Sequence, residues 1–104
     1  MNATTLNISK VSDGDSLTVS LEGRLDTTSA PQLEAEVKGW LAGVKSLVFD
    51  MSALEFVSSA GLRVFLLAQK AMSKQGTMTI RNLRPDVLKV FEVTGFSRIL
   101  KIEK

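Results

Sequence analysis

The sequence predicts an α/β domain with a mixed, mostly parallel sheet, an N-terminal antiparallel hairpin and about three to four packed helices. Residues 6–21 hold two stretches of alternating apolar and polar residues around a turn, which is the pattern of a hairpin. After residue 30 the chain switches repeatedly between helical and strand periodicity, which favours parallel strands joined by crossover helices. Because 104 residues are enough for one compact domain, we expect residues 1–104 to form a single domain.

The hairpin and the loop after it come first along the chain. Residues 6–8 and 17–21 alternate apolar and polar side chains, and Asp13-Gly14-Asp15 between them is a turn signal. One face of this hairpin should be covered and the other wetter. Residues 23–28 break both periods and therefore predict a loop.

The first helix is expected to begin at Ser29. Ser29 and Gln32 have the spacing of a capping box, Pro31 suits the first turn, and apolar residues recur at helical spacing as far as Leu41. Residues 47–49 do not alternate, so they predict a central strand covered on both faces.

A second helix is expected from about Ser59 to Met72, with Ser58 as its N-cap. It is apolar on most sides, so it should be deeply packed. The stretches 23–28 and 50–59 both follow predicted strands. We therefore expect these loops to lie together at the C-terminal ends of the strands, where α/β folds usually carry their sites.

The last third of the chain predicts three further elements. Residues 77–81 predict a strand, and Pro85 opens a third helix that ends at Gly95. Arg98 to Ile102 is expected to form a short last strand.

Composition excludes several classes of function. Without Cys the chain cannot form disulfides or use a thiolate, and without His it lacks the usual general base and the commonest metal ligand. The net charge of +2 is too small to indicate a nucleic-acid partner. No apolar run is long enough to cross a bilayer, and no signal-peptide pattern is present. The absence of Cys fits the expectation of a cytoplasmic protein.

The charge is unevenly distributed along the chain. Residues 1–57 hold four basic and eight acidic side chains, whereas residues 58–104 hold nine and three. The basic side chains of the second half either solvate helix faces or form a surface that complements a charged protein partner.

The motifs of common enzymes are absent. The glycines are scattered, so no Gly-rich phosphate loop exists, and the nucleophile-elbow pattern is missing. Asp26, Asp50 and Glu55 could cluster around a divalent cation, and a serine with a lysine base is possible on composition alone. No spacing supports either, so we expect no catalytic residues, no metal and no cofactor.

Ser58 and Ser59 are the candidate functional residues. Backbone N–H groups in a first helical turn have no intrahelical partner, and the helix dipole favours an anion there. A hydroxyl at that point can carry a phosphate at little cost to the fold. From the residues alone the simpler interpretation is that Ser58 is a plain N-cap and Ser59 an ordinary polar residue of the first turn, because Ser is common at helix starts.

The chain also contains five segments in a specific order: Gly23-Arg24-Leu25-Asp26, Val48-Phe49-Asp50-Met51-Ser52, Phe56-Val57-Ser58-Ser59-Ala60-Gly61-Leu62, Pro85-Asp86-Val87 and Phe91-Glu92-Val93-Thr94-Gly95-Phe96. In this order and spacing they resemble the STAS domains of bacterial anti-sigma factor antagonists (anti-anti-sigma factors). The resemblance covers nearly the whole sequence. It implies a single STAS domain and a small cytoplasmic switch protein that is not an enzyme.

The resemblance also implies partners. In that family the unmodified antagonist binds an anti-sigma factor that is also a serine kinase, and this releases the sigma factor. The kinase phosphorylates one serine with ATP, the complex falls apart, and a PP2C-type phosphatase resets the switch. Neither direct contact with nucleic acid nor membrane insertion is implied.

Individual roles follow from the same resemblance. The family's Asp-Ser-Ser/Thr-Gly motif corresponds to Ser58-Ser59-Ala60-Gly61, so Ser59 takes the phosphoacceptor position, with Ser58 as the alternative. Asp26 matches the loop aspartate beside the acceptor. The expected partner-binding residues are Asp26, Thr27, Ser58, Ser59, Ala60, Gly61 and Arg63.

Related STAS modules occur in transporter tails, sensor complexes and lipid-transport machinery. A regulatory module of another signalling, exopolysaccharide or lipid-transport complex is therefore the alternative function.

Overall fold

The computed structural model describes residues 6–103, so residues 1–5 and 104 of the predicted domain lie outside it. The elements are β1 (Leu6–Asp13), β2 (Ser16–Leu25), α1 (Ala30–Trp40), β3 (Ser46–Val57), α2 (Ser59–Met72), β4 (Thr77–Arg81), α3 (Pro85–Val93), the 3-10 helix η1 (Phe96–Arg98) and β5 (Ile102–Glu103). This order of strands and helices confirms the predicted α/β fold class.

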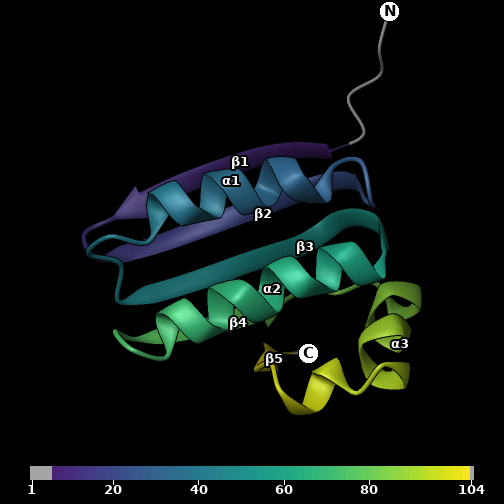
Figure 1. The fold of residues 1–104 in the computed structure, drawn as a ribbon. Helices are drawn as coiled ribbons and strands as arrows, with labels where there is room; N and C mark the ends of the chain where they lie inside the picture. Colours follow the sequence, from purple (N-terminus) through teal and green to yellow (C-terminus); the bar gives the residue numbers. More distant parts are fainter. Residues whose placement is uncertain (1–5, 104) are drawn as a thin grey trace, which may run out of the picture.

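The five strands form one sheet in the order β1-β2-β3-β4-β5 (Figure 1). β1 pairs antiparallel with β2, and every later pair is parallel. Successive right-handed crossovers between neighbouring strands place their helices on one side of the sheet. Figure 1 shows α1 and α2 together on that side, and the domain is flat, at 34 × 34 × 19 Å.

Burial follows this one-sided arrangement. In β2 the apolar residues Leu17, Val19 and Leu21 are buried, whereas Ser20 and Glu22 between and after them are exposed. On the helix side, the Phe49 and Phe65 rings meet edge to face with their centroids 5.0 Å apart. The ring centroids of Phe91 in α3 and Phe65 are 5.9 Å apart, so α3 packs on the same core.

β3 differs most from the prediction. It continues to Val57, so residues 50–57 are strand and not loop. Two irregularities in its pairing with β2 insert extra residues on β3, opposite Ser20 to Glu22 and opposite Gly23 to Arg24. These bulges interrupt the alternation of apolar and polar side chains by which a strand is predicted from sequence. Val48 is also partly exposed, so the prediction that residues 47–49 are covered on both faces was wrong.

Three smaller predictions also fail. The loop over residues 23–28 is shorter than predicted, because β2 extends to Leu25. Ser29 makes no side-chain bond to the first turn of α1, so the expected capping box is absent. Phe96–Arg98 forms a 3-10 helix, and the last strand is confined to Ile102–Glu103.

The turn between α2 and β4 is tied to the start of β3. The Gln75 side chain donates to the carbonyls of Leu41 and Val44, at 2.5 and 2.7 Å. The N–H of Thr77 donates to the Lys45 carbonyl at 2.9 Å. A Cβ on Gly76 would overlap that same Lys45 oxygen, so only glycine permits this approach.

We predict that Gly76→Ala lowers the free energy of unfolding by about 1–3 kcal/mol, because backbone must move to make room for the methyl group. Gly39→Ala is the matched control, since the space around Gly39 in α1 is open. It should raise the free energy of unfolding by about 0.5–1 kcal/mol. Urea denaturation followed by circular dichroism measures both, and a fully stable Gly76→Ala protein would contradict the assignment.

Candidate partner-binding site

The C-terminal ends of β2 and β3 lie side by side, and this brings together two segments that are distant in the sequence. Leu25 and Val57, the last residues of β2 and β3, are paired in register, and the Ser58 N–H donates to the Leu25 carbonyl at 2.9 Å. A Cβ on the buried Gly61 would lie 2.6 Å from the Leu25 Cγ. Glycine at this position therefore lets the first turn of α2 pack directly against Leu25, next to the loop that begins at Asp26.

The Asp26 loop is held by its own polar groups. Asp26 Oδ1 accepts hydrogen bonds from the Thr28 hydroxyl at 2.7 Å, the Thr28 N–H at 3.0 Å and the Ser29 N–H at 3.1 Å. These bonds, led by that of the Thr28 hydroxyl, hold the pKa of Asp26 below its ordinary value of 3.8. The side chain is therefore a carboxylate at neutral pH.

The buried Ser29 side chain also stabilises this loop. It is 2% exposed, and its hydroxyl accepts from the Asp26 N–H at 2.9 Å while it donates to the Arg24 carbonyl at 2.8 Å. A buried hydroxyl with both partners in place stabilises one loop conformation. This role explains why Ser29 is not available as a cap for α1.

The two serines differ in their surroundings. Ser58 is the N-cap of α2, half-buried, and its Oγ accepts from the Gly61 N–H at 3.3 Å. Ser59 is the first helical residue and is exposed. No acidic side chain stands in the first turn of α2, so the positive end of the helix dipole is unopposed there.

The other predicted site residues fall into two groups. Thr27 and Arg63 are exposed, and Asp26 and Ala60 are partly exposed, so all four are accessible from outside. Gly61 is buried. Its predicted role as a direct partner contact does not fit this burial, and the glycine instead shapes the surface from beneath.

One pair beside the site was not predicted from sequence. The Arg24 guanidinium lies 4.4 Å from the centre of the Phe56 ring, and these residues are paired in register between β2 and β3. Phe56 is 38% exposed, which is high for a large aromatic side chain. Aromatic and arginine side chains are enriched at energetically important positions of protein interfaces. The alternation of apolar and polar residues could not predict this pair, because the two bulges in β3 determine which residue lies opposite Arg24.

The structure gives no support to a metal centre or a membrane span. Within residues 6–103, no group of three or more acidic side chains is placed to hold a metal ion, so Asp26, Asp50 and Glu55 do not form the cluster considered from sequence. Asp50 Oδ1 instead accepts from the Ser52 N–H and from the Asn82 side chain. None of the described helices has the length and apolar character needed to cross a bilayer.

Comparison with known proteins now decides the family. Residues 7–104 match the family described as the STAS domain. The chain belongs to the STAS domain family. A relative named as an anti-sigma factor antagonist, BtrV of Bordetella bronchiseptica, is 39% identical over 88 residues, covering 83% of this chain and 76% of the relative. This family of antagonists is regulatory and not catalytic.

Solved structures show the same fold. The STAS domain resembles an anti-sigma factor antagonist from Mycobacterium paratuberculosis with a TM-score of 0.85 and 23% identity, covering 93% of this chain and 84% of that one. It also resembles the phosphorylated form of the Bacillus cell fate determinant SpoIIAA, with a TM-score of 0.72 and 19% identity over 94% of this chain and 92% of the other.

We predict that Ser58→Ala lowers the free energy of unfolding by about 1 kcal/mol, because it removes the side-chain acceptor of the Gly61 N–H. Ser59→Ala should change it by less than about 0.5 kcal/mol, since the exposed hydroxyl holds no such bond. Urea denaturation of the two matched variants checks this difference. Equal losses would contradict the assignment of Ser58 as the cap.

We also predict that Thr28→Val raises the pKa of Asp26 toward 3.8, because the variant lacks the hydroxyl that bonds Oδ1. A depressed pKa contributes stability above the unfolded value, and that contribution is lost as the pH falls through the folded pKa. The free energy of unfolding should therefore increase less between strongly acid and neutral pH in Thr28→Val than in the wild type. A carboxyl NMR titration measures the shift, with the exposed Thr27→Val as the control in which no shift is expected.

Proposed function

We propose that this STAS domain is an anti-sigma factor antagonist that is switched by phosphorylation of Ser59. In its unphosphorylated form it binds an anti-sigma factor that is also a serine kinase, and this releases a sigma factor. The observation that carries the proposal is the exposed Ser59 at the first turn of α2, in a chain related to a protein named as an anti-sigma factor antagonist. We infer that the protein acts in the cytoplasm, by protein binding and without catalysis of its own.

Phosphate at Ser59 would leave the fold intact. The kinase would transfer the terminal phosphoryl group of ATP to Ser59 Oγ, releasing ADP and a proton. The modification adds about −1.5 to −2 charges, which the N-terminal end of a helix tolerates well. SpoIIAA in its phosphorylated form has the same fold as this chain, which is in line with this expectation.

The same phosphate would weaken docking. A partner surface that fits a neutral hydroxyl must desolvate the added charge, and the nearby Asp26 carboxylate adds repulsion. The expected partner surface comprises Asp26, Thr27, Ser58, Ser59, Ala60 and Arg63, extended by Arg24 and Phe56. A PP2C-type phosphatase would restore the hydroxyl. The switch needs no change of shape in the antagonist, because the difference in binding energy alone is enough.

We predict that Ser59→Asp binds the cognate kinase at least about tenfold more weakly than wild type, which corresponds to about 1.4 kcal/mol. Ser59→Ala should bind in the presence of ATP without being released. Isothermal titration calorimetry measures the affinities. Ser9→Asp, on the exposed strand β1, adds the same charge away from the site and should bind as the wild type does.

Mass spectrometry after incubation with the kinase and ATP tests the acceptor directly. The expected fragment ions place a single phosphate on Ser59. A phosphate on Ser58, or none, would overturn the assignment of Ser59.

A pull-down from the native host separates this function from the alternative regulatory module. Recovery of a kinase-like anti-sigma factor supports the proposal. Recovery of an exopolysaccharide or lipid-transport complex in its place would support the alternative.

A further inference from the structure

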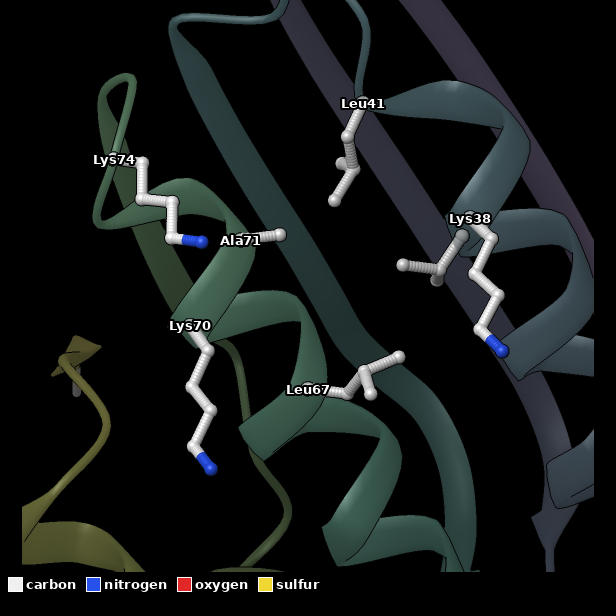
Figure 2. A pocket seen from close by; sticks show the side chains of 7 residues that line it. Lys38, Leu41, Leu67, Lys70, Ala71 and Lys74 are labelled. Carbon is white, nitrogen blue, oxygen red and sulfur yellow. The ribbon is translucent and has the colours of Figure 1, made fainter.

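A groove between α1 and α2 lies far along the helices from Ser59. It has a volume of about 370 Å³, and its apolar wall is formed by Val37, Leu41, Leu67 and Ala71. Figure 2 shows Leu67 and Ala71 pointing from α2 toward α1, with Leu41 reaching into the same gap from the end of α1. Leu67 is 39% exposed, so this apolar surface is open to solvent.

Three lysines surround this apolar wall. Lys38 stands on α1, and Lys70 and Lys74 stand on α2 (Figure 2). Lys38 contacts Glu34 at 3.2 Å, but both side chains are exposed, so this pair is weak. Neither Lys70 nor Lys74 forms an ion pair with any described residue between 6 and 103. The groove therefore combines an apolar interior with positive charge at its edge.

We propose that this groove binds a fatty-acid carboxylate, with the alkyl chain along the apolar wall and the head group near Lys70 and Lys74. The volume lies at the lower end of the range for small-molecule pockets, about 300–1,000 Å³. A second copy of the chain is a poor occupant, because a symmetric contact would bring the three lysines against the same three lysines. The inference does not depend on phosphorylation of Ser59.

The test is an NMR titration of the full chain with octanoate, decanoate and dodecanoate, each kept below its micelle concentration. We expect saturable amide shifts confined to the C-terminal halves of α1 and α2. Affinity should increase about two- to fourfold with each added methylene, because more apolar surface leaves water. Decyltrimethylammonium, which has an alkyl chain but a positive head group, should bind at least threefold more weakly than decanoate.

Variants identify the source of each contribution. Lys70→Gln with Lys74→Gln should weaken decanoate binding about three- to tenfold. Lys89→Gln with Lys101→Gln removes the same charge from positions outside the groove and should have no effect. Leu67→Gln should weaken the binding of decanoate and of the cationic amphiphile alike, and circular dichroism checks that each variant is folded.

Several outcomes would overturn the proposal. One is the absence of saturable shifts at millimolar decanoate. Another is equal binding of the cationic amphiphile, or shifts centred on Val93 and Ile99, which are exposed apolar residues elsewhere. Binding of an acidic amphipathic peptide to the groove without binding of fatty acids would assign the groove to a protein partner.

Discussion

The pairing of Leu25 with Val57 fixes the candidate site. Their register, together with the bond from the Ser58 N–H to the Leu25 carbonyl, sets where β3 stops and where α2 starts. Gly61 then allows the helix to pack on Leu25 without a side chain in between. The exposed hydroxyl of Ser59 and the Asp26 loop owe their proximity to this contact, although they are far apart in the sequence.

The two sides of this site use different devices to keep their geometry. The Asp26 loop is stabilised by a carboxylate whose Oδ1 accepts hydrogen bonds from Thr28 and Ser29, and by the buried Ser29 hydroxyl. The start of α2 is stabilised by the Ser58 cap, which leaves the neighbouring Ser59 without a structural task. A residue without a structural task can change its charge while the surrounding bonds persist. This division of labour suits a surface that must be modified without unfolding.

Much of the fold was predictable from sequence, because it depends on local periodicity. The order of strands and helices, Ser58 as the N-cap and the start of α2 at Ser59 all follow from patterns within a few residues. The length of β3 was not predictable, because its bulges depend on pairing with a strand far away in the sequence. Ser29 does occupy the N-cap position of α1, but its hydroxyl bonds to the Asp26 N–H and the Arg24 carbonyl and not to the first helical turn. The residue type alone could not distinguish these two uses of the hydroxyl. The Arg24–Phe56 contact depends on the same bulges, which set the pairing of the two residues. No pattern within a few residues could therefore predict it.

The flatness of the domain has a consequence for its cooperativity. With α1 and α2 on one side of the sheet, a single apolar layer separates strands from helices, and the far face of the sheet is largely polar. Undocking of either helix from the sheet would expose this apolar layer to water along its whole length. No second core would remain to hold the strands together. Melting should therefore be all-or-none, so partly unfolded forms with exposed strand edges stay scarce.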